Sequence, residues 1–520
     1  MNNGKICISV AAETADEMIA KIKQAEALAD VIEVRFDSLR PDELEALHTR
    51  EIGSCGPSNP IIDSTKVPLI STFRPRDQGG YRELTWDERR DFWNAGFETE
   101  YCDVEDETFL DDSWSWLWNL RISSFHDFQG TPDNLEAIFD RFVQIDSQVV
   151  KIAITANDAV NAIPVWNLLK FALRYGSIAR PKVIPIAMGD AGKWTRILGL
   201  AHGAFLTYAS LDPGNETAPG QVSADDLIDV YRVKELDKDT KVFGVIGDPI
   251  SQSMSPYMHN PAFVELGLNA VFIPFLVKNI CEFITRMVKP ATREVELNFG
   301  GFSVTMPHKQ SIIPCLDAID EVAKAIGAVN TVHIDEEGKL TGYNTDAHGF
   351  ITPLKAKFGD VRDARVAVFG AGGAARAVVY ALKQEGADVT VFARDAAKGK
   401  AFADEFGVRS STIADLRSEI SNLGSNFDIL VDTTPLGMKG PNENGSLFNA
   451  DELKGLKFVY DLVTKMTDTP LIAAAKKAGI PAIGGLDMLI AQGAKQLDIW
   501  TGRPGPEILM REKLLARMAK

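Results

Sequence analysis

Lys151 lies inside an apolar run, Val149-Val150-Lys151-Ile152-Ala153-Ile154. An unpaired ammonium is costly to bury, so such a lysine either reaches the mouth of a pocket or is held neutral by desolvation. Both situations suit an amine that attacks a carbonyl carbon and forms a Schiff base. The alternative is a structural lysine whose ammonium reaches solvent from an edge strand.

His126 ends the preceding β-rich run, in SSFHDFQGTP. Histidine exchanges protons near neutral pH, although a lone histidine is more often structural. The ends of other runs supply Glu33 and Arg35 in EVRFD, Arg74 in TFRPRDQGG, and Arg196 after IPIAMGDAGKWT. Three arginines and an acid at one mouth describe a pocket for a small polyhydroxy anion.

A second group of polar residues lies after residue 250. Ser253 and Ser255 stand two apart in SQSMSP, so in an extended segment their hydroxyls share a face and can hold one carboxylate. A strand ending at Thr305 would deliver Lys309, and the turn-forming run in GYNTDAHG places Asp346 at a loop. Taken singly, these residues also fit a helix cap, an exposed lysine and an Asx turn.

The stretch FGAGGAAR follows an apolar run and precedes a helical one. Its G-x-G-x-x-A spacing suits a dinucleotide, because the glycines allow a tight turn and close approach to the pyrophosphate. Arg394 and Lys398 lie after the next strand, where a cation suits a 2′-phosphate and favours NADP, although Asp395 keeps a surface arginine possible. The predicted cofactor positions are Gly370, Gly372, Gly373, Ala374, Ala375, Arg394 and Lys398.

Eight β-rich runs alternate with helical stretches before Tyr231, which predicts an N-terminal (β/α)8 TIM barrel over residues 1–232. Chemistry is then expected at the carboxyl ends of the strands. The charged stretch 233–241, VKELDKDTK, is predicted to be a linker. Strands and helices alternate again after Val242, and residues 364–395 form one βαβ unit of a Rossmann-type domain.

Composition limits the class of protein. The chain has 520 residues, 45% hydrophobic and 24% charged, with a formal net charge of −17. This charge opposes nucleic-acid or anionic-membrane binding as the main activity, and no apolar stretch approaches a membrane span. The five cysteines are odd in number and form no C-x-x-C pair, so we expect reduced thiols and no metal site. We expect a cytoplasmic protein, plastid-located only if a longer precursor exists.

The motifs E-x-R-x-D, TFRP…GG, HD, VVKIA, MGDxGxxxR and APGQ occur in this order. The ordered set resembles type I 3-dehydroquinate dehydratase over residues 4–232. The resemblance implies an imine between Lys151 and the substrate ketone, with His126 moving the proton alpha to it. Gln78 departs from the family, whose glutamate there is thought to orient the histidine, so Asp77 or Asp127 could take over. The implied substrate-binding positions are Glu33, Arg35, Arg74, Arg196, Thr217, which replaces a family serine, and Gln221.

The motifs SxSxSPxxHN, SVTMPHK, AIGAVNT, GYNTD, GAGGAAR and GLDMLIAQ resemble shikimate dehydrogenase over residues 242–520. The resemblance implies a substrate domain of residues 242–348 plus 485–520 and an NADP domain of residues 349–484. It makes Lys309 and Asp346 the pair beside the reacting carbonyl. The implied substrate-binding positions are Ser253, Ser255, Thr305, Asn330 and Gln492. The departures from the family pattern are Ser303, Ala393, Asp395 and Thr464.

The two resemblances describe successive reactions, because 3-dehydroshikimate is the product of the first and the substrate of the second. The chain as a whole therefore resembles the bifunctional 3-dehydroquinate dehydratase/shikimate dehydrogenase family, with 3-dehydroquinate, 3-dehydroshikimate, shikimate and NADP as its small molecules. Two alternatives stay open, a non-catalytic sensor that keeps both folds and a dehydrogenase that also uses quinate. The presence of Lys151 and Lys309 favours an enzyme, and Ser255 and Thr305 favour shikimate. The oligomeric state stays open.

Overall fold

The structure is a computed structural model, and it describes residues 2–48, 59–95, 99–105, 120–145, 147–175, 180–419 and 423–519. The chain divides into two compact units, which are taken separately below. The first comprises residues 1–242, 249–253 and 269–298, and the second comprises residues 243–248, 254–268 and 299–520. Within the described ranges, no helix is long and apolar enough to cross a membrane.

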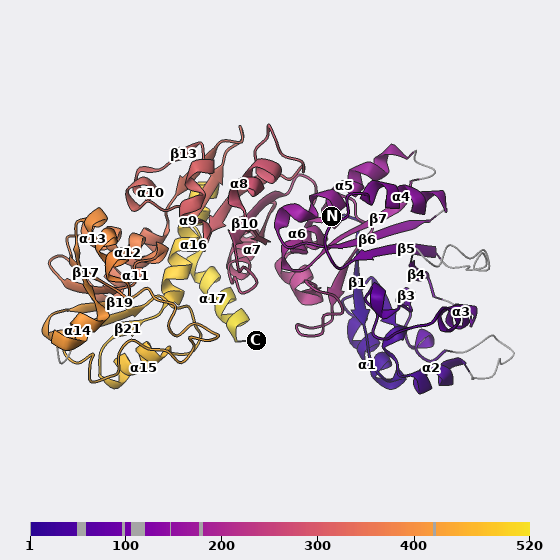
Figure 1. Cartoon of the computed structure of the whole chain (residues 1–520), viewed down its shortest axis with the longest axis horizontal. Helices are drawn as coiled ribbons and strands as arrows, with labels where there is room; N and C mark the ends of the chain where they lie inside the picture. The colour runs from indigo at the N-terminus through magenta and orange to yellow at the C-terminus, as the bar shows by residue number, and fades with distance from the viewer. Residues whose placement is uncertain are drawn as a thin grey trace. The chain divides into compact units, whose positions relative to one another are not determined.

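The first unit is built on a parallel sheet in the order β7-β6-β5-β4-β3-β2-β1-β8-β9 (Figure 1). A hydrogen bond of 2.8 Å from Phe205 N, beside β8, to Val183 O in β7 joins the two ends of the eight-strand series. These are the eight predicted runs, and the barrel prediction is confirmed. The strands are β1 (Lys5–Val10), β2 (Val31–Arg35), β3 (Leu69–Thr72), β4 (Tyr101–Glu105), β5 (Leu120–Asp127), β6 (Val149–Thr155), β7 (Lys182–Met188), β8 (Leu206–Ser210) and the short β9 (Val222–Ser223).

Helices alternate with these strands and begin at local signals in the sequence. Thr14 caps α1 by accepting from Glu17 N, and Thr85 with Glu88 forms a capping box at α3. Apolar side chains such as Cys7, Ile122 and Ile184 from successive strands form one buried core cluster. The helices are α1 (Ala15–Ala25), α2 (Pro41–His48), α3 (Trp86–Asn94), α4 (Leu135–Gln144), α5 (Ile163–Phe171) and α6 (Lys193–Leu198).

The five cysteines do not share one state. Cys7 and Cys102 are buried free thiols, and burial raises the pKa of both. Cys281 and Cys315 are disulfide-bonded, so the expectation of reduced thiols is wrong for these two. Cys55 lies outside the described residues.

A six-stranded mixed sheet follows, in the order β11-β10-β12-β14-β15-β13. Strand β14 is antiparallel to both β12 and β15, which brings the carboxyl end of β12 beside the start of β14. The strands are β10 (Lys241–Gly247), β11 (Ala270–Leu276), β12 (Phe299–Val304), β13 (Ala318–Ile319), β14 (Thr331–Ile334) and β15 (Leu340–Tyr343). The helices are α7 (Pro256–Glu265), α8 (Ile280–Phe283), α9 (His308–Ser311), α10 (Glu321–Ile326) and α11 (Asp346–Phe358).

The last sheet is fully parallel, in the order β18-β17-β16-β19-β20-β21. This 3-2-1-4-5-6 order is that of the Rossmann fold, and the predicted class is confirmed. Side chains of β16 alternate between two cores, Val366 and Val368 in one and Ala367 and Phe369 in the other. The elements are β16 (Arg365–Phe369), α12 (Gly373–Gln384), β17 (Asp388–Ala393), α13 (Ala396–Phe406), β18 (Arg409–Thr412), α14 (Ile413–Glu419), β19 (Ile429–Asp432), β20 (Phe458–Asp461), α15 (Pro470–Lys477), β21 (Ala482–Ile483), α16 (Gly485–Thr501) and α17 (Glu507–Met518).

Candidate active sites

A cavity of about 230 Å³ lies in the barrel of the first unit. Its wall brings together every site residue that the sequence predicts for this half. The wall also contains Gln78 and the aromatic side chains of Phe128 and Tyr208. The predicted residues in the wall are Glu33, Arg35, Arg74, His126, Lys151, Arg196, Thr217 and Gln221.

Lys151 is the central cation of this wall. Its strand β6 pairs with β5 on one side and β7 on the other, which excludes the edge-strand alternative. The residue is 4% exposed, and its Nζ donates to Asp103 Oδ2 at 2.7 Å. Glu33 Oε1 is 4.0 Å from the same Nζ, and the centre of the Tyr208 ring is 4.4 Å away. The ammonium is therefore balanced by two carboxylates and one aromatic face.

Asp103 and Arg74 connect Lys151 to His126. Arg74 donates to Asp103 Oδ1 at 2.7 Å, to Glu105 Oε1 at 2.9 Å and to His126 Nε2 at 3.0 Å. Burial alone would raise the pKa of Asp103, but Arg74 and Lys151 outweigh it and hold this pKa far below its usual range. Asp103 is therefore ionised and ties both cations to strand β4.

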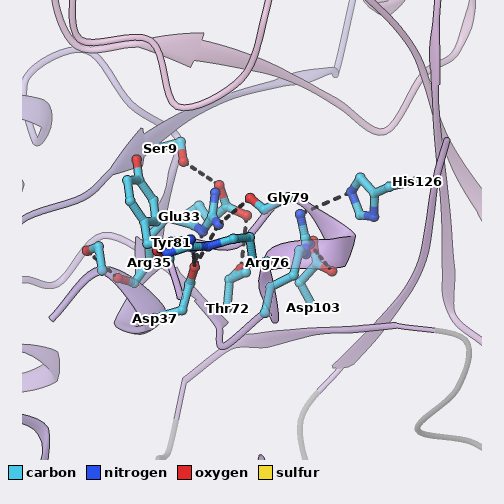
Figure 2. A network of polar contacts seen from close by, with 12 residues as sticks. Ser9, Glu33, Arg35, Asp37, Thr72, Arg76, Gly79, Tyr81, Asp103 and His126 are labelled. Atoms are coloured by element: carbon cyan, nitrogen blue, oxygen red, sulfur yellow. Dashed lines mark hydrogen bonds and ion pairs between the residues drawn. The ribbon is translucent and has the colours of Figure 1, made fainter. Parts of the chain in front are cut away.

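His126 is held as a neutral imidazole. Burial, followed by the charge of Arg74, lowers its pKa well below the usual value. Because the Arg74 guanidinium can only donate, His126 Nε2 accepts, and the proton of the neutral ring is on Nδ1. Nδ1 has no hydrogen-bond partner among the described residues. In Figure 2 a dashed line marks the hydrogen bond at the His126 ring.

The remaining arginines of the wall differ in what they contact. Arg35 forms a two-point ion pair with Asp37, at 3.0 and 2.8 Å, and also donates to Gly79 O (Figure 2). Arg196 is 3% exposed, forms no ion pair within the described part of the chain, and its Nε has no hydrogen-bond partner there. Burial lowers the pKa of Arg196 to about 10. It is the cation of this wall that still has capacity for an anion.

The loop after β8 and the loop after β3 contain the residues that depart from the family pattern. Thr217 N donates to Gln221 Oε1 at 2.8 Å, so these two wall residues hold each other. Gln78 lines the cavity, Asp77 is exposed, and Asp127 accepts from the backbone of Gln129 and Gly130. In this structure, the side chain that hydrogen-bonds to the His126 ring is Arg74.

Sequence reasoning missed the residues that support these side chains. Ser9 and Thr72 donate to the two oxygens of Glu33, and Arg89 shares Glu105 with Arg74. For the strand residues of this set, the signal was a polar residue at every second position of an apolar strand, which places it inside the barrel. In β4 this pattern gives Asp103 and Glu105.

The second candidate site contains another lysine–aspartate pair. Lys309 lies in the short helix α9, and its Nζ donates to Asp346 Oδ2 at 2.5 Å. Asp346 is the first residue of α11 rather than a loop residue, because Asn344 Oδ1 caps the helix by accepting from Asp346 N and Ala347 N. The positive end of α11 thus faces the carboxylate.

Asn330 and Gln492 are brought to this pair. Asn330 Nδ2 donates to Asp346 Oδ1 at 2.8 Å and lies 3.5 Å from Gln492 Oε1. Thr305 follows β12, and its backbone N–H donates to Ile246 O. The residue is half-buried. Ser253 lies in the turn after β10, and Ser255 is the N-cap of α7. Ser255 O accepts from the ring of His259.

The glycine turn after β16 fits the phosphates of a dinucleotide. Gly370 has φ of 114°, and a Cβ there would lie 2.2 Å from Thr433 Oγ1, so only glycine fits. Around Gly372 a Cβ would meet nothing within 4 Å, which leaves open space at the N-terminus of the twelve-residue helix α12. A Cβ at Gly373 would lie 3.6 Å from Lys309 Cδ, so this turn adjoins the lysine.

The residues after β17 are arranged to leave two cations free. Arg394 and Lys398 are both exposed. Asp395 is the N-cap of α13 and accepts from Lys398 N at 3.1 Å, so its carboxylate is used by the helix. Ala393 is buried against Gly399, and Thr464 is exposed.

Four family models match the chain in succession. They are type I 3-dehydroquinase over residues 6–238, the shikimate dehydrogenase substrate-binding domain over 245–332, shikimate/quinate 5-dehydrogenase over 353–436, and the shikimate 5′-dehydrogenase C-terminal domain over 485–515. The order agrees with the two sites described above.

Curated relatives agree with these matches. The chain is 33% identical to the chloroplastic bifunctional 3-dehydroquinate dehydratase/shikimate dehydrogenase of Arabidopsis thaliana, over 98% of this chain and 84% of that protein. It is 42% identical to shikimate dehydrogenase (NADP(+)) of Geobacter sp. strain M21, over 54% of this chain and 96% of that protein. A crystal structure of shikimate dehydrogenase in complex with NADP+ is 35% identical, with a TM-score of 0.50, over 55% of this chain and 98% of that one. The chain belongs to the family of bifunctional 3-dehydroquinate dehydratase/shikimate dehydrogenases.

Proposed function

We propose that the chain dehydrates 3-dehydroquinate to 3-dehydroshikimate in the barrel and reduces 3-dehydroshikimate to shikimate with NADPH in the second unit. The observation that carries the proposal is the barrel cavity, where a buried lysine, a neutral histidine and an unpaired arginine share one wall. The same proposal divides the chain into four parts. They are the barrel, residues 1–232; the linker, residues 233–241; the substrate domain, residues 242–348 with 485–520; and the NADP domain, residues 349–484.

In the barrel, the substrate carboxylate is proposed to pair with Arg196, which places the ring ketone toward Lys151. After the Lys151 ammonium has released a proton to solvent, the neutral amine, held beside the ionised Asp103 at 2.7 Å, attacks the carbonyl carbon. Water leaves as the imine forms. Nε2 of neutral His126, once released by Arg74, then removes the alpha proton, and the ring returns a proton to the departing hydroxyl. Water finally releases the product from Lys151. Glu33, Arg35, Thr217 and Gln221 surround the ring hydroxyls.

In the second unit, NADPH supplies a hydride when it is bound. We assign its phosphates to the glycine turn and the N-terminus of α12, and its 2′-phosphate to Arg394 and Lys398. The Lys309 ammonium stabilises charge on the carbonyl oxygen and donates a proton there, while Asp346 holds the ammonium in place. Ser253 and Ser255 bind the carboxylate, and Thr305, Asn330 and Gln492 the ring hydroxyls.

The test is incubation of the chain with 3-dehydroquinate and NADPH, followed by detection of shikimate. The Lys151→Met variant should leave 3-dehydroquinate unconverted, and the Lys309→Met variant should convert it only as far as 3-dehydroshikimate. Borohydride with 3-dehydroquinate should leave an adduct on Lys151, mapped by mass spectrometry. Binding of these compounds without turnover would instead favour the sensor, and equal oxidation of quinate and shikimate with NADP+ would favour the broader dehydrogenase.

A further inference from the structure

A line of buried side chains begins at Asp346 of the Lys309–Asp346 pair and leads away from Lys309. Its members are Ser303 in β12, Gln496 in α16, and Thr331 and Asn330 at the start of β14. Ser303 and Thr331 are direct cross-strand neighbours, and the Gln496 amide spans them. Gln496 is 1% exposed and Thr331 is fully buried.

The donor and acceptor of every hydrogen bond in this line follow from the contacts that Asn330 makes with Asp346 and Thr345. An ionised carboxylate only accepts, so Asn330 must present Nδ2 to Asp346 Oδ1, at 2.8 Å. A backbone N–H only donates, so Asn330 Oδ1 must face Thr345 N, at 2.7 Å. These two contacts establish which atom of the Asn330 amide is the nitrogen and which is the oxygen.

The orientation passes outward from Asn330. Thr331 Oγ1 lies 2.8 Å from Asn330 Oδ1, so its single proton goes to that oxygen and it can only accept from its other neighbours. These are Thr345 Oγ1, at 3.3 Å, and one amide atom of Gln496, which is therefore the donor Nε2, at 3.1 Å. Nε2 also faces Asn330 O at 3.4 Å, another acceptor. Gln496 Oε1 then accepts from Ser303 Oγ at 2.7 Å.

We propose that Gln496, Thr331 and Ser303 are positioning residues for the reduction step, forming a one-way hydrogen-bond relay that fixes the Asn330 amide against Asp346. The inference rests on the proposed function of the second unit. Without the relay, the Asn330 amide has fewer bonds to hold it, and both Asp346 and the Lys309 ammonium lose a fixed partner. A small misplacement of catalytic groups lowers kcat strongly, whereas it leaves the binding of the more distant cofactor nearly unchanged.

The experiment measures 3-dehydroshikimate reduction by Thr331→Val, which keeps the side-chain shape and removes the hydroxyl. We expect kcat to fall by about 10-fold to about 100-fold with an unchanged KM for NADPH. Thr331→Ser restores the hydroxyl and should recover most of the rate. Thr341→Val is the matched control, since Thr341 lies in the neighbouring strand β15 and its side chain forms no hydrogen bond within the described ranges.

Gln496→Met provides a second break in the relay from another helix. It should lower kcat in the same way, while NADP+ binding, measured by calorimetry, reports that the unit is folded. Combining Gln496→Met with Thr331→Val should cost little more than either change alone, because both act through Asn330. Wild-type kcat in both single variants overturns the relay, whereas a wild-type chain that reduces no 3-dehydroshikimate overturns the proposed function itself.

Discussion

The two candidate sites contain the same pair of residues in different surroundings. Lys151 and Asp103 are 2.7 Å apart, and Lys309 and Asp346 are 2.5 Å apart. The Lys151 side chain is 5% exposed, and its aspartate is shared with Arg74. The Lys309 side chain is 19% exposed, and the other oxygen of its aspartate accepts from a neutral amide.

The difference follows from what each lysine is proposed to do. A nucleophile must give up its proton, and the carboxylate beside Lys151 is also paired with Arg74, so it keeps a cationic partner when the amine is neutral. A proton donor must be held beside the reacting oxygen, and among the described residues Asp346 forms an ion pair with Lys309 alone. The same two residue types therefore serve opposite proton movements because their neighbours differ.

The largest effect should come from removing the buried lysine. Lys151→Met eliminates the amine that forms the imine, and we expect dehydratase kcat to fall by more than about 10³-fold. Reduction of added 3-dehydroshikimate by the same preparation should be unchanged. The change of absorbance on dehydration measures the first rate, and NADPH oxidation measures the second. Retention of dehydratase activity would contradict the nucleophile assignment.

Removing the aspartate separates the two pairs by stability. Asp103→Asn leaves Lys151 and Arg74 buried beside a neutral amide, and breaking a buried ion pair costs about 3–5 kcal/mol. Asp346→Asn removes the ionic partner of the half-buried Lys309 only, and we expect the free energy of unfolding to fall by about 1 kcal/mol. Calorimetric melting of the two variants and the wild type gives both values. Equal losses would mean that burial does not distinguish the pairs.

The sequence predicted the fold and the members of each site better than their contacts. Eight β-rich runs and a glycine turn were enough for the barrel and the Rossmann sheet, because period and turn chemistry are local. Lys151 and His126 were found as polar residues in apolar strands. Asp103 was missed because its partners come from β3 and β6, and only barrel closure brings those strands to one interior.

The predicted helper of the histidine shows the same limit. Asp127 is its neighbour in sequence and Asp77 is the neighbour of Gln78, yet Arg74 of another strand end contacts the ring. Asp346 was expected in a loop, and the cap by Asn344 makes it the start of a helix. Such contacts depend on which side chains meet after packing, and single-sequence patterns do not encode that.

The buried histidine should give a pH-dependent stability. Its pKa in the folded chain is below the unfolded value of about 6.5, so below that pH the unfolded state binds the extra proton. The contribution of neutral His126 to the free energy of unfolding is therefore complete above the unfolded pKa of about 6.5. Below that pH it decreases by about 1.4 kcal/mol per pH unit. Thermal melts of wild type and His126→Gln between about pH 5 and about pH 8 should differ in slope by this amount. His202, whose pKa burial also lowers, contributes equally to both.

The smallest effect is expected at the surface of the second unit. Arg394 is exposed and its neighbour Asp395 is used as a helix cap, so the guanidinium is free to contact a 2′-phosphate. Arg394→Ala should lower the preference for NADPH over NADH by about 10-fold, because one exposed charge-assisted contact is worth about 1.4 kcal/mol. The matched control is Arg409→Ala, an exposed arginine that pairs with Asp388 on the same sheet. If the ratio of kcat/KM for the two cofactors changes equally in both variants, general surface charge rather than Arg394 sets the preference.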